Sequence, residues 1–585
     1  MFPRWTIFLA LIAATASRAC AQTVFGDWSY VITNGTAAIS AYQGGAGNAV
    51  VPDVIEQKPV TIVGVGANVD PTAKLTGLVV SDNVVTIGAR AFENATNLTS
   101  LTLGTNVRSI GRAAFGTAGK LTNVVIPDSV VTIGDYAFEK TANLSSLTLG
   151  TNVQSIGYGA FGGGAASKLT NVVIPDSVVT IGDYAFEKAS NVSSLTLGSG
   201  VQSIGAQAFT YAYKLTNLVI PDSVTTIGTN AFVFATNLTS VTLGPRLQTI
   251  GPRSFGDAYK LARVVIPDSV TTIGANAFWK AYNLSNLLLG SGLVTIGNGA
   301  FSYAYRLTNV VIPDSVRTFN GYAFFNATNL ARVTLGAGLT NIGYGEFSGC
   351  AKLQEIIIPA GVTSVGDFAF NYCSALTNVS FPGALTNIGS YAFQECASLT
   401  GVVVPDSVKA VGPWAFAYGD RLSTATIGSG VNQISDNMFN SCTNLTSAVF
   451  GSGVTSVGDN VFTNCPKLAS VLFLGAAPAL PGVNKVVFGS NQTATVYYVP
   501  GAQGWGASWA GRPTAAFVLK STGVSYSPGV VTFSWFATGA VPVSVERRAS
   551  LQTVGWTRLV SGLTNGVFVD QAPPAGAGFY RAVCP

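Results

Sequence analysis

A repeat of 23 residues runs through most of this 585-residue chain and limits the folds that it can adopt. Between Leu75 and Lys467 we count seventeen units, sixteen of which have that length, such as LTNVVIPDSVVTIGDYAFEKTAN from Leu121. The unit that begins at Leu144 has two additional residues, and we expect a bulged loop at its glycine-rich stretch, residues 162–164. A unit this short cannot bury its own apolar face, so successive units must stack on one another. The repeat therefore predicts a solenoid of about seventeen coils.

The apolar positions of the unit predict short β-strands. Positions one, four, six, ten and thirteen are apolar, as Leu121, Val124, Ile126, Val130 and Ile133 illustrate. β-Branched residues at a spacing close to two residues are typical of strands. We therefore expect a mainly β solenoid in which every coil contributes parallel strands.

A phenylalanine occupies position eighteen of all seventeen units, from Phe92 through Phe278 to Phe462. One aromatic ring per coil predicts a continuous stack along the core. Burial of each ring should contribute roughly 1.5–3 kcal/mol to stability.

Position fourteen is glycine in fifteen of the seventeen units, and Asn320 and Ser435 replace it in the other two. Glycine and asparagine both tolerate a positive φ angle. We therefore expect this position to turn the chain in a left-handed conformation.

A second period of 46 residues arises because units with Ile-Pro-Asp-Ser alternate with units with Leu-Gly-Thr or Leu-Gly-Ser. Aspartates thus recur in every second coil, at Asp128, Asp176, Asp222, Asp268 and Asp314. Like charges in adjacent coils would lie about 4.8 Å apart, so we interpret the alternation as a way to limit repulsion. The doubled spacing of about 9.6 Å is near the carboxyl separation of inverting glycosidases. Equivalent solvated aspartates, however, do not provide the raised pKa that a catalytic acid needs.

The consensus L-x-x-V-x-I-P-x-x-V-x-x-I-G-x-x-A-F-x-x-C/A-x-x resembles the BspA-type leucine-rich repeat of bacterial surface proteins. The units at residues 169–191 and 353–375 are examples, and the resemblance covers about two-thirds of the chain. It implies a leucine-rich-repeat solenoid in an exported protein whose relatives act in adhesion or ligand binding.

The segments outside the repeat suggest five parts. Residues 1–21 contain a basic, an apolar and a small-residue region in the order of a secretory signal peptide. Residues 22–74 are expected to cap the solenoid of residues 75–467 at its N-terminal end, and residues 468–520 at its C-terminal end. Residues 521–585 alternate strand-like runs with Gly, Pro and Ser turns, which predicts a small β-sandwich-like module.

The chain contains no histidine, which removes the commonest general base and the commonest metal ligand. Charged residues make up only 10% of the sequence, and its net charge of +5 is dispersed rather than gathered into a nucleic-acid-binding surface. The apolar run at residues 6–16 is too short to span a bilayer. We therefore expect no enzyme activity, no cofactor or metal, no nucleic-acid partner and no transmembrane span in the mature chain.

Five cysteines recur at position twenty-one, where most other units have alanine: Cys350, Cys373, Cys396, Cys442 and Cys465. Neighbouring coils would bring some of them close enough for a disulfide, which export permits. Because they replace alanine in a core-facing column, we favour buried thiols over disulfides or a metal site. Cys584 has no partner by the logic of the repeat and would be available to react or to link chains.

Aromatic residues outside the phenylalanine column cluster in units six to ten. They occupy positions twenty and twenty-two, with Trp279 beside them: Tyr211, Phe234 and Tyr303, and then Tyr213, Tyr259, Tyr282 and Tyr305. A purely structural column should run along the whole solenoid, so this local cluster predicts a ligand-binding ridge for a sugar or a protein. The alternative is a set of rings that only pack coil on coil.

Two classes of function remain open. The first is a secreted or cell-surface recognition or adhesion protein, cleaved after Ala21, which presents its repeat surface to an extracellular protein or glycan. The second is a structural surface component or spacer whose C-terminal module does the attaching. Binding to the repeats would favour the first class, and binding confined to residues 521–585 would favour the second.

Overall fold

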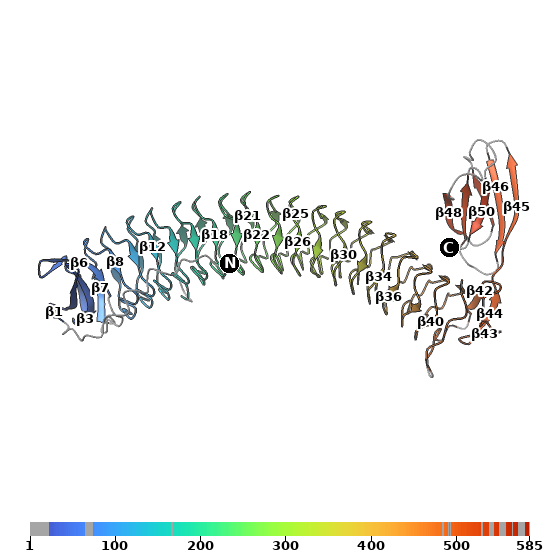
Figure 1. Cartoon of the computed structure of the whole chain (residues 1–585), viewed down its shortest axis with the longest axis horizontal. Coiled ribbons are helices and arrows are strands. Elements are labelled where there is room, and N and C mark those ends of the chain that lie inside the picture. The colour runs from blue at the N-terminus through green and yellow to red at the C-terminus, as the bar shows by residue number, and fades with distance from the viewer. Residues whose placement is uncertain are drawn as a thin grey trace. The chain divides into compact units, whose positions relative to one another are not determined.

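The computed structural model describes residues 23–64, 74–164, 168–482, 485–489, 491 and 493–527, together with five strands between residues 530 and 583. The chain forms two compact units, Met1–Leu215 and Thr216–Pro585. The residues described in each unit form β-strands and turns and contain no α-helix (Figure 1). The predicted signal-peptide segment and Cys584 lie outside the described residues.

The first unit begins with a cap of six strands: β1 (Thr23–Phe25), β2 (Trp28–Thr33), β3 (Thr36–Tyr42), β4 (Gly47–Val50), β5 (Val54–Ile55) and β6 (Lys58–Val63). Trp28 and Tyr30 are buried in it, and the Trp28 indole N–H donates to the Val50 carbonyl at 3.0 Å. β4 and β6 each pair in parallel with a strand of the first coil. The cap therefore covers the end of both coil sheets.

Each coil contributes one strand at about positions three to five and another at positions twelve and thirteen. In the first unit the former are β7 (Leu75–Val79), β9 (Ser100–Thr102), β11 (Asn123–Val125), β13 (Ser146–Thr148), β15 (Asn171–Val173) and β17 (Ser194–Thr196). The latter are β8 (Thr86–Ile87), β10 (Ser109–Ile110), β12 (Thr132–Ile133), β14 (Ser155–Ile156), β16 (Thr180–Ile181) and β18 (Ser203–Ile204).

The second unit repeats this arrangement over a longer stretch. Its first series is β19 (Asn217–Val219), β21 (Ser240–Thr242), β23 (Arg263–Val265), β25 (Asn286–Leu288), β27 (Asn309–Val311), β29 (Arg332–Thr334), β31 (Glu355–Ile357), β33 (Asn378–Ser380), β35 (Gly401–Val404), β37 (Thr424–Ile427), β39 (Ser447–Phe450) and β41 (Ser470–Phe473). Its second series is β20 (Thr226–Ile227), β22 (Thr249–Ile250), β24 (Thr272–Ile273), β26 (Thr295–Ile296), β28 (Thr318–Phe319), β30 (Asn341–Ile342), β32 (Ser364–Val365), β34 (Asn387–Ile388), β36 (Ala410–Val411), β38 (Gln433–Ile434) and β40 (Ser456–Val457).

The register follows the repeat. Val124 pairs with Leu147 in one series, and Thr272 pairs with Thr295 in the other, each 23 residues later and each in parallel. The expected mainly β solenoid with parallel strands is therefore confirmed.

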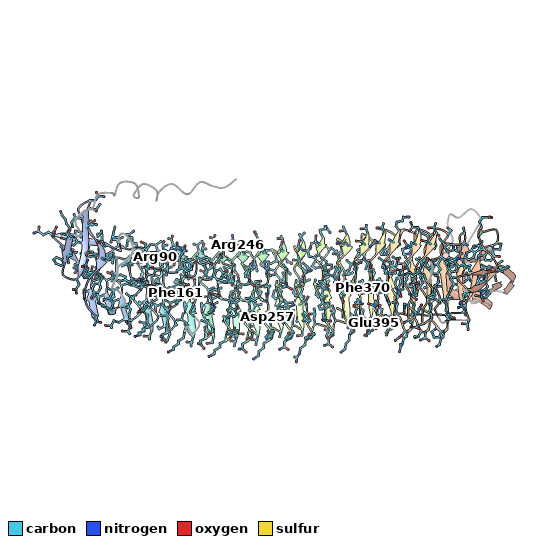
Figure 2. The ribbon with its side chains drawn as sticks, turned by 90° about the horizontal axis from the view of Figure 1, so that it is seen from below. Arg90, Phe161, Arg246, Asp257, Phe370 and Glu395 are labelled. Atoms are coloured by element: carbon cyan, nitrogen blue, oxygen red, sulfur yellow. The ribbon has the colours of Figure 1, made fainter. Side chains whose placement is uncertain are left out.

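The phenylalanine column forms the centre of the core, as the sequence predicts. Within each unit, successive rings stack with their centroids 5.1 to 5.9 Å apart, as Phe278 does with Phe255 and Phe301. Each of these side chains is at most 5% exposed. Phe161 and Phe370 lie along the middle of the coils of their respective units (Figure 2).

The expectation that position fourteen is left-handed is wrong. Positive φ angles occur instead at position sixteen of all seventeen units and at position twenty of most, such as Tyr136 (57°) and Lys140 (60°). A Cβ atom on Gly134 would lie 2.8 Å from the backbone nitrogen of Arg112 in the preceding coil. Position fourteen therefore favours glycine because adjacent backbones approach closely there, and not because of its φ angle.

The alternating aspartates have a direct structural role. Asp128 accepts a hydrogen bond of 2.7 Å from the backbone N–H of Thr151, and Asp176 accepts one of 2.6 Å from Ser199, each in the next coil. Hydrogen bonds from the backbone N–H and the side chain of Ser199 lower the pKa of Asp176, which is the opposite of what a catalytic acid needs. The 46-residue period thus alternates coils whose aspartate accepts this hydrogen bond with coils whose backbone N–H donates it.

The last repeat is followed by β42 (Thr495–Tyr498), β43 (Ser508–Trp509) and β44 (Arg512–Ala516), and β42 pairs in parallel with β41. The Trp509 indole packs beneath them and donates to the Pro478 carbonyl at 3.0 Å. Beyond this point lie two three-stranded antiparallel sheets. One contains β45 (Leu519–Ser527), β46 (Val530–Ala537) and β49 (Gly566–Asp570), and the other β47 (Val543–Arg548), β48 (Thr557–Leu563) and β50 (Phe579–Val583).

Candidate functional site

The predicted tyrosines at position twenty-two form a ladder in the second unit. The Tyr259 and Tyr282 rings stack with their centroids 5.1 Å apart and an interplanar angle of 8°. Tyr305 continues the stack at 5.2 Å from Tyr282. This geometry follows from the register, because the same position in successive coils lies one strand spacing apart.

From Tyr305 the ring contacts continue at other repeat positions on the surface of the coils. The Tyr305 ring contacts that of Tyr303 edge to face at 6.1 Å, and Tyr303 contacts Phe325 at 5.4 Å. Phe325 contacts Tyr322, at position sixteen, with their centroids 5.3 Å apart. The ring contacts that begin at position twenty-two therefore continue at position sixteen.

Position sixteen and its immediate neighbours carry the aromatic row further. From Tyr322 the successive centroid distances are 5.1 Å to Tyr344, 5.3 Å to Phe368, 4.7 Å to Tyr391 and 6.2 Å to Trp414. With Tyr418 and the edge contact of Trp279 with Tyr303, these rings form one connected row, which we call the aromatic belt. Its members are Tyr259, Trp279, Tyr282, Tyr303, Tyr305, Tyr322, Phe325, Tyr344, Phe368, Tyr391, Trp414 and Tyr418.

Sequence reasoning identified only the first part of the belt. Its continuation at Tyr322 and Phe368 was missed although both share position sixteen, because Tyr344 at position fifteen and Phe325 at position nineteen interrupt that column. The signal that could have revealed it is aromatic recurrence in adjacent columns rather than within one column.

The belt reaches the solvent through ring edges and hydroxyl groups. Tyr305 is 37% and Tyr344 45% exposed, and the other members are half-buried. Near-parallel stacking covers both ring faces of Tyr282, so its edge is the part directed outward. The two alternatives drawn from the sequence are therefore not exclusive, since these rings pack against one another and also form part of the surface.

A buried polar cluster supports the N-terminal end of the belt. Asp257, whose side chain is only 2% exposed, pairs with Arg253 at 3.3 Å and accepts a hydrogen bond from the Tyr259 hydroxyl at 3.0 Å. Burial, followed by this hydrogen bond, raises the pKa of Tyr259. The Trp279 ring lies near two cations, with Lys280 Nζ 4.0 Å and Arg253 Cζ 5.3 Å from its centroid. Asp257 and Glu395, both at position twenty, lie along the same edge of the second unit (Figure 2).

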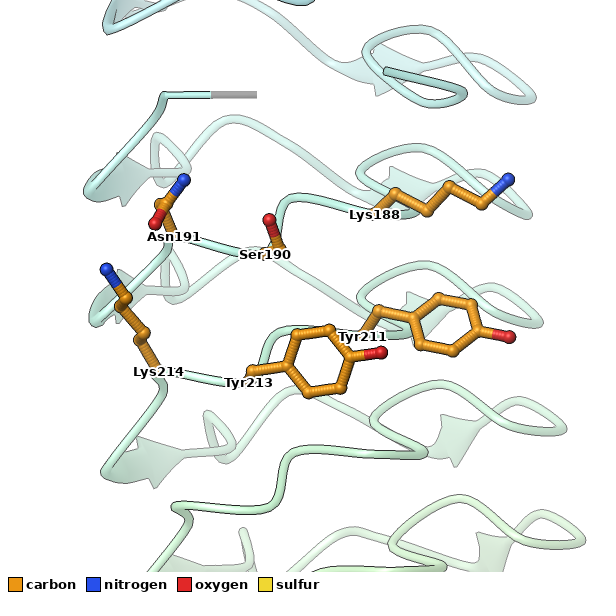
Figure 3. A pocket seen from close by; sticks show the side chains of 6 residues that line it. All are labelled: Lys188, Ser190, Asn191, Tyr211, Tyr213 and Lys214. Carbon is orange, nitrogen blue, oxygen red and sulfur yellow. The ribbon is translucent and has the colours of Figure 1, made fainter. Parts of the chain in front are cut away.

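Tyr211 and Tyr213 are the predicted site residues of the first unit. They lie in the first unit, with their ring centroids 5.8 Å apart, and line a surface hollow with Lys188, Ser190, Asn191 and Lys214 (Figure 3). Phe234 is half-buried in the second unit. The predicted site residues therefore belong to both units.

The five repeat cysteines are buried thiols, as the alanine-like column suggests. Cys350 Sγ donates to the Phe324 carbonyl at 3.3 Å, and Cys373 Sγ donates to that of Phe347 at the same distance. Burial raises the pKa of both thiols, so they remain protonated. Within the described ranges, no group of three or more acidic or cysteine side chains could hold a metal ion.

In-register coils of 23 residues around a phenylalanine stack, with an aromatic row on their surface, define a leucine-rich-repeat solenoid. The sequence matches the BspA type Leucine rich repeat region over residues 70–166, 164–285, 294–420 and 363–477, which together exceed half of the chain. The chain belongs to this family. No curated protein matches it.

One solved structure supports the fold. A leucine-rich repeat protein from Bacteroides ovatus is 24% identical with a TM-score of 0.54, and the match covers 68% of this chain and 98% of that protein. A leucine rich cell surface protein from Faecalibacterium prausnitzii is also 24% identical, with a TM-score of 0.30 and coverage of 66% and 94%. The pneumococcal vaccine antigen PcpA is 15% identical, with a TM-score of 0.26 and coverage of 82% and 94%. Among the residues with described positions, no helix is long and apolar enough to cross a membrane.

Proposed function

We propose that this protein is an exported, non-catalytic recognition protein that uses the aromatic belt to bind an extracellular protein. The observation that carries this proposal is the connected row of twelve rings across eight coils of the second unit. Packing of the core does not require these rings, because the phenylalanine column already fills it. Tyrosine and tryptophan are the residues that most often dominate binding energy at protein interfaces.

The geometry of the belt favours a protein over a glycan as its ligand. Sugars stack on open ring faces, whereas Tyr282 and its neighbours present edges and hydroxyl groups. Eight coils at about 4.8 Å each extend over roughly 35 Å, a length that matches a protein interface of ordinary size. Tyrosine hydroxyls at such a surface can hydrogen-bond to a partner while the ring provides apolar contact.

The first test replaces exposed belt residues. After a screen of extracellular matrix proteins and a glycan array identifies a ligand, a Tyr305→Ala/Tyr344→Ala variant should lose at least about 2 kcal/mol of binding free energy. We choose these two tyrosines because they are the most exposed members of the belt. Tyr259 is less suitable, because its removal would leave buried Asp257 without the hydroxyl donor.

Tyr372→Ala is the matched control. Tyr372 is 55% exposed and lies in the same stretch of coils, but it is outside the belt. Its replacement should leave the affinity within about 0.5 kcal/mol of the original. Equal affinity of the double variant and this control would refute the belt as the binding surface, and binding retained by residues 521–585 alone would favour the spacer function.

Export is the second part of the proposal, and it rests on the character of residues 1–21. Arg4, the apolar run at residues 6–16 and the small residues before Gln22 follow the order of a cleavable signal. We expect the protein recovered from outside the cytoplasm to begin at or near Gln22. N-terminal sequencing or intact mass measurement checks this, and retention of residues 1–21 in most of the native protein would contradict it.

A further inference from the structure

The first unit contains a concave surface feature near its C-terminal end. Two successive coils form a hollow of about 450 Å³, lined by Lys188, Ser190, Asn191, Tyr211, Tyr213 and Lys214 (Figure 3). This volume falls within the usual range for small-ligand sites, about 300–1,000 Å³. We call it the Tyr213 hollow.

We propose that the Tyr213 hollow binds an acidic saccharide. Its lining combines the three chemistries that such a ligand requires. The tyrosine rings offer apolar surface to the C–H groups of a sugar ring, and Tyr213 is 41% exposed. Lys214 provides an ammonium group for a carboxylate or sulfate, and Ser190 and Asn191 add polar groups to the lining.

The charge of the hollow favours an anion. None of its six lining residues is acidic. Glu187 lies outside the lining, with its carboxylate 3.7 Å from Lys188 Nζ, and it leaves the second cation, Lys214, to balance the ligand.

The size of the hollow favours a saccharide over a protein. A stable protein interface buries about 800 Å² on each partner and involves 20 or more residues, about three times the number that line this hollow. A concave site with two rings and a few polar groups is typical of small-ligand recognition. An acidic peptide therefore serves as a competing outcome of the experiment.

The site arises from a local change in the repeat. Position twenty-two is Ala142 in the third coil and Ser190 in the fifth, whereas the sixth coil has Tyr213 there and Tyr211 at position twenty. The lysine of the fifth coil, Lys188, also has a counterpart, Lys140, which lies beside Glu139 as Lys188 lies beside Glu187. The chain thus contains a lysine in the same local setting without the two tyrosines.

Calorimetric titration of the full-length mature protein with defined tetrasaccharides tests the proposal. A tetramer of galacturonic acid and a chondroitin sulfate tetrasaccharide represent the two acid types, and cellotetraose and tetraglutamate are the neutral and peptide controls. We expect at least one acidic saccharide to bind with a Kd of roughly 1 mM or tighter, and its affinity to fall as salt rises. The two acid types distinguish a carboxylate from a sulfate ligand.

Variants locate the binding. Tyr213→Ser, which introduces the residue found at this position in the fifth coil, and Lys214→Gln should each weaken binding about tenfold or more. Lys140→Gln should leave the affinity unchanged. Thermal unfolding should be the same for all three, because each change lies at the surface.

Three results would overturn the proposal: no acidic saccharide binds at millimolar concentration, cellotetraose binds equally well, or tetraglutamate binds with the same dependence on Tyr213. The belt and the hollow are tested independently. The Tyr305→Ala/Tyr344→Ala variant should retain saccharide binding even where it loses the protein ligand. A result that refutes protein binding by the belt therefore leaves the saccharide proposal intact, and a result that refutes saccharide binding leaves the belt proposal intact.

Discussion

Phe278→Ala is expected to destabilise the second unit by about 3–5 kcal/mol. The Phe278 side chain is fully buried, and its ring stacks between Phe255 and Phe301 at centroid distances of 5.3 and 5.4 Å. Alanine removes the apolar burial and leaves a cavity that two rigid neighbouring coils cannot close. Denaturant unfolding followed by circular dichroism measures the loss.

The matched control for this change lies in the same coil. Val265→Ala removes an apolar side chain that is 41% exposed on the strand surface, and it should cost less than about 0.5 kcal/mol. A cost below about 1 kcal/mol for Phe278→Ala would show that the column does not form the core.

Glu346 is expected to destabilise its coil increasingly as the pH rises. It occupies position seventeen, where thirteen of the seventeen units have alanine, and it is fully buried. One carboxyl oxygen accepts a hydrogen bond from the Ala323 N–H at 3.2 Å, whereas the other has no partner in the described structure. Burial raises the pKa of Glu346 to about 8, and the N–H groups of Ala323 and Gly321 limit this rise.

The sign of the effect follows from proton linkage. The pKa of Glu346 is higher in the folded protein than the ordinary glutamate value of 4.5 that applies to an unfolded chain, so between these two values the folded state binds the additional proton. Stability from this residue is therefore highest below about pH 4.5 and declines by about 1.4 kcal/mol per pH unit until about pH 8. Above pH 8 the total loss reaches roughly 3–5 kcal/mol.

Glu346→Gln removes the titration and should stabilise the protein relative to the original chain by a few kcal/mol at pH 9. Denaturant unfolding at several pH values, with hydrogen exchange of the amides of this coil, measures the difference. Glu355→Gln, which replaces an exposed carboxylate in the next coil, is the control. It should change neither the free energy of unfolding nor the hydrogen exchange of these amides. A stability difference between Glu346→Gln and the original that stays constant from pH 5 to pH 9 would contradict the assignment.

The surroundings of Glu346 explain why the solenoid accommodates it. The preceding coil has Asn320 in place of the usual glycine and Phe319 in place of the usual isoleucine. The paired series of two-residue strands also stops at β28 and begins again at β30. These departures from the repeat coincide with the buried carboxyl group, which marks this coil as a local irregularity in the second unit.

The core could be predicted from the sequence because one physical requirement controls each of its columns. Phe278 and its equivalents are never replaced, and only burial in every coil accounts for that. The glycine column was misassigned because two causes give the same pattern. A positive φ and a close backbone approach both favour glycine, and Gly134 is there for the second reason. Conversely, Trp414 adopts a φ of 60°, which its residue type disfavours. The conformational preference of tryptophan therefore could not predict this left-handed position.

The candidate site was only partly predictable for a related reason. Tyr259, Tyr282 and Tyr305 share one column, and alignment of the units reveals them. The step through Tyr303 and Phe325 depends on how side chains cross between columns, which repeat alignment does not contain.

The hydrogen bond from each aspartate to the following coil has a consequence for how such a chain can change length. A coil with Asp176 needs a neighbour that offers a free backbone N–H at Ser199, and that neighbour has no aspartate of its own. Two adjacent coils of the donor kind do occur in the chain, as at Ser429 and Ser452, so the requirement runs only from an aspartate coil to the coil that follows it. Duplication of a whole pair of coils keeps each aspartate next to such a donor coil. The nearly identical units at residues 121–143 and 169–191, two units apart, have the spacing that duplication of such a pair would leave.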